Sequence, residues 1–141
     1  FVRWLWRPLG EPTLPVRQPP RVREARVRLV DDAKRLDSKL LRIGMLPFPA
    51  MRSIGAVIDF AKQANEYGER LQEHGLSLYY HNHHIEFAKF DGKYMLDIIA
   101  ENSPAMGMEI DVHWVQRGGL DPVRRDALIE RFDFVLYERI T

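Results

Sequence analysis

Polar and apolar residues alternate in two segments of this chain, 76–83 and 106–114, a period of two that is typical of β-strands. A short apolar segment at 40–46 and the segment at 134–140 are two further expected strands. One face of these strands is apolar. The opposite face is polar, and its ionisable groups increase toward the carboxyl ends: Arg42, Tyr79, His81, His83, Glu109, Asp111 and His113. Any chemistry of this chain is expected where those carboxyl ends meet.

Between the strands, apolar residues recur three and four positions apart, which predicts helices. The four expected helices cover residues 22–36, 53–74, 93–102 and 122–131. Ser53 is the expected N-cap of the second helix, and Gly75 stands where a left-handed C-terminal residue belongs. Asp121 followed by Pro122 is a typical helix start.

Strands that alternate with helices of this length predict right-handed βαβ units and a parallel sheet. A doubly wound sheet needs two apolar faces, whereas a (β/α) barrel accepts polar groups inside, near the carboxyl ends of its strands. The predicted fold class is therefore α/β, a partial (β/α) TIM-type barrel with about four βα units and a parallel sheet. An eight-unit barrel needs roughly 200 residues or more. We expect either a fragment or a sheet that is completed by self-association.

The amino-terminal segment differs in composition from the rest. Residues 1–30 hold seven arginines, two glutamates and five of the nine prolines, a net charge of +5 that leaves −4 for residues 31–141. Prolines break helices and strands, so we expect about the first 20 residues of this basic segment to be poorly ordered, with the barrel domain at 31–141. A basic arm for nucleic acid and a solvated tail are both open, and the scarcity of aromatic residues favours the tail.

The overall composition narrows the class of partner. The net charge is +1, which gives no strong attraction to nucleic acid or membranes. Cysteine is absent, which suits a reducing cytoplasm and excludes disulfides and cysteine-metal sites. There is no run of about 18 apolar residues that would span a membrane. No membrane or nucleic-acid partner is expected.

Two motifs carry a family resemblance. The first is LYYHNH at 78–83, followed by EF at 86–87 and DG at 91–92; the second is EIDVHWVQRGG at 109–119, followed by DPV at 121–123. Together, at this separation, they resemble the sugar phosphate isomerase/epimerase family, which has a xylose-isomerase-like TIM barrel. The similarity covers about residues 32–123 and corresponds to the fourth to sixth strands of the barrel.

The resemblance implies a divalent metal, Mn, Mg, Co or Zn, at the mouth of the barrel. Asp111 matches the sixth-strand aspartate ligand, and His81 stands where the fifth-strand ligand is commonly a glutamate. Histidine also binds these metals. Glu86 is the nearest carboxylate that can substitute, and it is the candidate catalytic residue. The family's seventh-strand histidine and eighth-strand glutamate have no counterpart here, so we expect the ligand set within this chain to be incomplete.

The implied reaction is proton transfer next to a sugar carbonyl, in which a metal stabilises the enediolate and a carboxylate moves the proton. A small sugar or sugar phosphate is the expected substrate, with His83, His113 and Arg117 as candidate binding residues. Arg117 and the glycines that follow it can hold a phosphate, although a plain connection is an equal alternative.

Less specific interpretations stand beside these. Asp111 can be a cap at a strand end, and an ion pair with Arg42 is the favoured interpretation of Glu109. The chain can also be an incomplete barrel without catalysis of its own. A metal-dependent hydrolase on a related barrel, such as an endonuclease acting at abasic sites, is disfavoured by the modest basic content outside the amino-terminal segment.

Overall fold

The structure of the chain, a computed structural model, describes residues 20–122 and 134–136. Its elements are α1 (Pro20–Arg35), β1 (Leu40–Ile43), η1 (Phe48–Arg52), α2 (Ile54–Gln72), β2 (Ser77–His81), η2 (Ile85–Phe87), β3 (Lys89–Phe90), β4 (Lys93–Tyr94), α3 (Met95–Glu101), β5 (Met106–Asp111), α4 (Val112–Arg117) and β6 (Phe134–Leu136). The proline-rich residues before Pro20 and nearly all of the helix expected at 122–131 lie outside the described residues, so those predictions stay untested.

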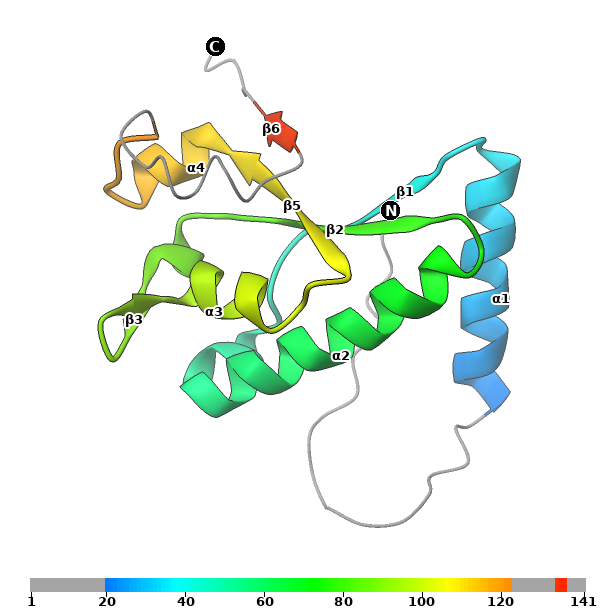
Figure 1. The fold of residues 1–141 in the computed structure, drawn as a ribbon, viewed down its shortest axis with the longest axis horizontal. Coiled ribbons are helices and arrows are strands. Elements are labelled where there is room, and N and C mark those ends of the chain that lie inside the picture. The colour runs from blue at the N-terminus through cyan, green and yellow to red at the C-terminus, as the bar shows by residue number, and fades with distance from the viewer. Residues whose placement is uncertain (1–19, 123–133, 137–141) are drawn as a thin grey trace.

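Four parallel strands form the sheet in the order β1-β2-β5-β6. Strand β2 pairs with β5 so that His81 lies opposite Glu109, and β5 pairs with β6 so that Asp111 lies opposite Leu136. Helices α2 and α3 lie along one side of this sheet, and α1 stands at one end (Figure 1). The predicted α/β class with a parallel sheet is confirmed, and the arrangement is that of one part of a TIM-type barrel.

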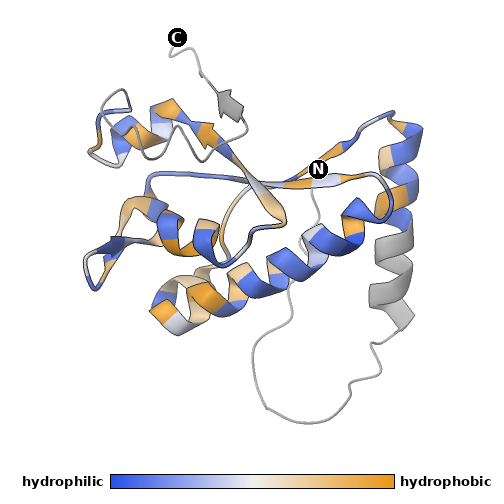
Figure 2. Ribbon diagram, in the orientation of Figure 1, coloured by the Kyte–Doolittle hydropathy of each residue, from blue (hydrophilic) through white to orange (hydrophobic). Residues whose placement is uncertain are grey.

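The core lies between the sheet and helix α2, because one face of each strand is apolar and buried. Leu78 and Tyr80 of β2 face this layer, as do Met108 and Ile110 of β5. Helix α2 contributes its own buried stripe of Val57, Phe60, Ala61 and Ala64. Apolar and polar residues alternate along this helix (Figure 2). The predicted apolar strand face is therefore confirmed for both strands.

The ends and the interior of α2 follow from particular residues. The hydroxyl oxygen of Ser53 accepts a hydrogen bond from the amide of Ala56 at 3.2 Å, and Gly75 has φ +73, so both predicted caps are confirmed. Gly68 lies inside the helix because a Cβ there would be 2.6 Å from the carbonyl oxygen of Ala105. This close approach fixes the loop that leads into β5.

The strand expected at 106–114 is shorter than predicted. Strand β5 ends at Asp111, and helix α4 begins at the next residue. The reason is local, since the side chain of Asp111 caps the first turn of α4. The placement of Val112, His113 and Trp114 on strand faces was therefore wrong.

The third expected helix begins later than predicted because a hairpin precedes it. Asp91 and Gly92, with φ 50 and 84, form a tight turn between β3 and β4. This hairpin takes residues 93–94 from the expected third helix, which begins at Met95.

The strands expected at 40–46 and 76–83 end earlier than predicted, at Ile43 and His81. His83 consequently lies in the loop that follows β2 and not on the strand.

Candidate functional site

An imidazole and a carboxylate converge at the carboxyl ends of the two central strands. His81 is the last residue of β2, and Asp111 is the last residue of β5. Because β2 and β5 are adjacent and parallel, their carboxyl ends lie at the same rim of the sheet. Nε2 of His81 is 3.9 Å from Oδ2 of Asp111, and both residues are buried. The predicted meeting of these two side chains is thus present in the structure.

The two carboxylate oxygens of Asp111 have different surroundings. Oδ1 accepts hydrogen bonds from the amides of His113 at 2.9 Å and Trp114 at 3.4 Å, which caps helix α4. Oδ2 is buried and has no hydrogen-bond partner among the described residues. The two interpretations of Asp111, cap and ligand, are therefore compatible, because each uses a different oxygen.

His81 lies in a buried setting with charges of both signs around it. Burial is the main cause that lowers its pKa below the ordinary value, and the charges of Arg42 and His83 act in the same direction. Glu109 and Asp111 partly oppose this shift. His81 is consequently neutral near pH 7, the form in which an imidazole nitrogen can bind a metal.

The lowered pKa predicts a pH dependence of stability. An unfolded histidine has a pKa of about 6.5, so below that pH the unfolded chain binds a proton more readily than the folded chain does. The free energy of unfolding should therefore fall as the pH drops below about 6.5 and level off below the pKa of folded His81. His81→Gln should flatten this dependence in urea titrations over that range. An unchanged slope would mean that burial of His81 is not its cause.

Glu109 is held by an ion pair with Arg42, as the sequence analysis favoured. Their Oε1 and Nη1 atoms are 3.0 Å apart. The same Oε1 lies 3.5 Å from Nδ1 of His81, without the geometry of a hydrogen bond. Glu109 therefore places negative charge beside His81 while its own charge is balanced by Arg42.

Glu86, the candidate catalytic residue, makes its hydrogen bonds to Tyr80 and His83, and not to His81 or Asp111. It is completely buried. Its Oε1 accepts a hydrogen bond from the hydroxyl of Tyr80 at 2.6 Å, and its Oε2 accepts one from the amide of His83 at 2.8 Å. Both oxygens are occupied by groups that hold the loop after β2, a geometry that favours a structural role.

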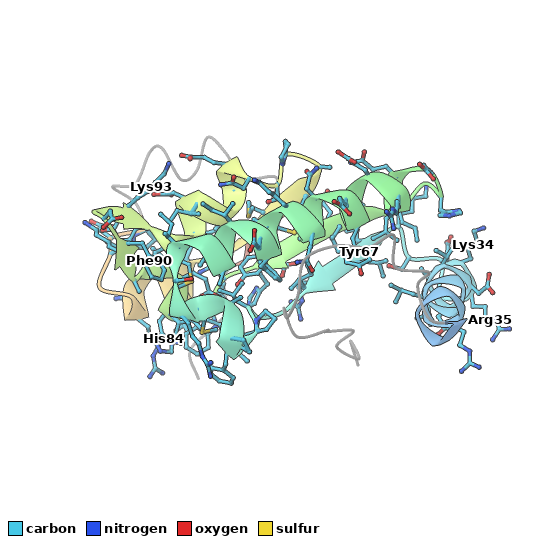
Figure 3. All side chains as sticks on the ribbon, turned by 90° about the horizontal axis from the view of Figure 1, so that it is seen from below. Lys34, Arg35, Tyr67, His84, Phe90 and Lys93 are labelled. Carbon is cyan, nitrogen blue, oxygen red and sulfur yellow. The ribbon has the colours of Figure 1, made fainter. Side chains whose placement is uncertain are left out.

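The three candidate substrate-binding residues surround Trp114. The ring of Trp114 lies 4.9 Å from that of His83 and 5.0 Å from that of His113, and the guanidinium of Arg117 lies 5.4 Å from it. Trp114 also stacks on His84 at 5.5 Å, and Figure 3 shows His84 at the end of the molecule opposite Lys34. The His83 ring is 5.0 Å from that of His81, so this group adjoins the pair formed by His81 and Asp111.

Comparison with solved structures places this geometry in a known fold. The chain superposes on a sugar phosphate isomerase/epimerase from Parabacteroides distasonis ATCC 8503 with a TM-score of 0.71 and 23% identity, over 82% of this chain and 44% of that one. A second sugar phosphate isomerase/epimerase from the same organism gives 0.69 and 22%, over 82% and 45%. The fold is similar to part of their barrel.

Sequence comparisons gave no match, either to a family model or to a curated protein. The chain spans less than half the length of the two enzymes that it superposes on.

Among the described helices, none has the length and apolar character needed to cross a bilayer.

The residues at the rim fit one part of a metal site. A carboxylate oxygen and a neutral imidazole nitrogen are donor atoms found in sites for Mn, Mg, Co or Zn ions. Oδ2 of Asp111 is such an oxygen, and it is buried without a hydrogen-bond partner among the described residues. Within residues 20–122 and 134–136, no group of three or more His, Asp or Glu side chains has the arrangement of a metal site. The described residues thus bring together two candidate donor atoms.

Asn82 is a residue of this rim that the sequence analysis did not select. It is completely buried, and its side chain bonds to the backbone of Asp111. The available signal was its position, since it directly follows the last residue of a strand and lies between two histidines. An asparagine at a strand end is usually a loop residue, so the pattern alone gave no reason to choose it.

Proposed function

We propose that this chain forms the metal-binding part of a sugar phosphate isomerase/epimerase-like barrel, which moves a proton next to a sugar carbonyl. The observation that carries the proposal is the convergence of His81 and Asp111 at the rim of two adjacent parallel strands. Active sites of (β/α) barrels are found at this rim. The likeness to two sugar phosphate isomerase/epimerases supports the same conclusion.

In this proposal, Oδ2 of Asp111 and Nε2 of His81 hold a divalent metal ion, Mn, Mg, Co or Zn. The ion would stabilise negative charge on the oxygen of the sugar carbonyl. The burial of both side chains excludes water from their surroundings, which strengthens electrostatic interactions there. The charge of Asp111 is kept available because only one of its oxygens is used in capping α4.

The group around Trp114 is the proposed contact surface for the sugar or its phosphate. His83 and His113 can donate hydrogen bonds to hydroxyl groups, and Arg117 can pair with a phosphate. For Glu86 we propose that it holds the loop after β2, since both of its oxygens accept hydrogen bonds within the protein. A cytoplasmic location is part of the proposal, because a chain without cysteine needs no oxidising compartment.

Calorimetric titration with Mn²⁺ at neutral pH tests the proposal. We expect binding by the unmodified chain and a large loss of affinity in His81→Ala. The matched control is His74→Ala, because His74 is exposed beyond the end of α2 and should have no effect. Absence of binding by the unmodified chain, or equal effects of the two variants, would contradict the proposed site.

A second candidate is a chain that binds metal but has no catalysis of its own. It is favoured by the small number of donors, two, that the described residues bring together. A second copy, through self-association, could supply further ligands and complete the barrel. Exchange of sugar C–H hydrogens in D₂O separates the candidates, since only a competent site exchanges them. Sedimentation analysis in parallel shows whether any exchange accompanies assembly.

A further inference from the structure

The buried side chain of Asn82 binds the backbone of Asp111 through two hydrogen bonds. Its Oδ1 accepts from the amide nitrogen of Asp111 at 2.8 Å, and its Nδ2 donates to the carbonyl oxygen of Asp111 at 3.4 Å. A carboxamide matches a peptide group in this way, because each offers one acceptor and at least one donor. Asn82 is completely buried, so water does not compete for these bonds.

These bonds continue the sheet beyond the point where its strands separate. Main-chain pairing between β2 and β5 ends with His81 opposite Glu109. Asn82 directly follows β2, and its side chain bonds to the backbone of Asp111, beyond this last main-chain pair. The end of β5 is therefore held to the residue after β2 at the point where β5 is followed by helix α4.

Asp111 is one of the two proposed ligands, and Asn82 is the direct neighbour of the other, His81. Asn82 is covalently joined to His81, and its side chain fixes the backbone of Asp111. The cap on α4 then fixes the carboxylate of Asp111, which leaves Oδ2 directed toward His81. We propose that Asn82 is a positioning residue that sets the separation between Nε2 of His81 and Oδ2 of Asp111. Its importance for metal binding rests on the function proposed above.

The alternative is a purely structural role, in which Asn82 forms hydrogen bonds because its polar groups are buried and thereby stabilises the whole fold. The two interpretations differ in where a substitution acts. Loss of a general stabiliser lowers protection against amide hydrogen exchange throughout the core. Loss of a positioning residue acts first on the amides of Asp111, His113 and Trp114, while core amides such as that of Ile99 keep their protection.

The test uses Asn82→Ala, with Ser103→Ala as the matched control. Ser103 is also completely buried and also bonds to a backbone carbonyl, that of Ile99 at 2.6 Å, but it follows α3, away from the rim. We expect Asn82→Ala to speed exchange of the Asp111, His113 and Trp114 amides about tenfold or more relative to core amides. We also expect it to weaken Mn²⁺ binding about 10–100-fold, the usual effect of removing a group that orients a ligand.

Ser103→Ala should leave both the relative exchange rates and the Mn²⁺ affinity unchanged. Equal acceleration of exchange throughout the protein in Asn82→Ala, or unchanged Mn²⁺ affinity beside a functional unmodified site, would overturn the inference. If the unmodified chain does not bind Mn²⁺, the proposed function fails, and the exchange rates still decide whether Asn82 orders Asp111.

One measurement does not depend on the folding of any variant. In the unmodified protein, the side-chain amide hydrogens of Asn82 and the backbone amide of Asp111 should exchange with solvent slowly, as hydrogen-bonded groups do. Rates equal to those of an exposed asparagine would overturn the inference.

Discussion

Asp111→Asn should lose most of its affinity for divalent metal while the protein remains folded. The substitution removes the negative charge from the buried oxygen near His81, and we expect a loss greater than the roughly 10–100-fold that follows removal of a group orienting a ligand. The fold should persist because asparagine is about as good an N-cap as aspartate, so its oxygen can still accept from the amides at the start of α4. Calorimetry with Mn²⁺ and circular dichroism measure the two properties.

Two controls make this prediction specific. Asp59→Asn carries the same charge change on the exposed side of α2 and should leave metal affinity unaltered. Asp111→Ala removes the cap as well as the ligand, so it should also lower the free energy of unfolding, by about 1 kcal/mol. Wild-type affinity in Asp111→Asn would mean that Asp111 is a cap and nothing more.

Glu86→Ala should destabilise the protein by about 3–5 kcal/mol, because it leaves the hydroxyl of Tyr80 and the amide of His83 without their acceptor and opens a cavity. Both hydrogen bonds lie in the buried region behind the loop that carries His83. Burial and the carboxylate of Glu86 also raise the pKa of Tyr80 well above its ordinary range, so Tyr80 acts only as a donor in this pair. Urea titration followed by circular dichroism gives the free energy of unfolding.

Tyr80→Phe provides the comparison, since it removes the donor and leaves the rest of the ring in place. The double variant should lose less stability than the sum of the losses in the two single variants, because both substitutions break the same hydrogen bond. A Glu86→Ala protein with unchanged stability but with no sugar proton exchange would instead support a catalytic role for Glu86.

The sequence was sufficient for the two central strands of the sheet, because alternation with a period of two occurs in both of them. Leu78, Tyr80, Met108 and Ile110 are buried on the face that the period of two indicated. Helix α2 was equally predictable, since its apolar stripe is long and Ser53 marks its beginning. In these segments local propensity and tertiary packing favour the same structure, and such agreement makes a sequence predictable.

The prediction failed where a side chain redirected the backbone. The alternation through Met106, Met108 and Ile110 continues to Val112 and Trp114, so the period alone extends the strand. Asp111 ends it by capping α4, a choice that depends on the geometry of one carboxylate. The hairpin at residues 89–94 was missed for a similar reason, because strands of two residues leave no measurable alternation.

Half of the candidate site followed from the sequence, and the other half required contacts across the fold. His81 and Asp111 each close a strand pattern, so their meeting at one rim could be expected from parallel pairing. The bonds of Asn82 to Asp111, and of Glu86 to Tyr80, join residues whose chemistry the sequence does not pair. The roles of Asn82 and Glu86 follow from these hydrogen bonds, which only the three-dimensional structure shows.

The most direct test of the metal site is a crystal structure of the chain with Mn²⁺, using data collected near the manganese absorption edge. We expect an anomalous difference peak between Nε2 of His81 and Oδ2 of Asp111, within bonding distance of both atoms. A peak elsewhere, or a carboxylate of Asp111 that only caps α4 in crystals containing saturating Mn²⁺, would contradict it.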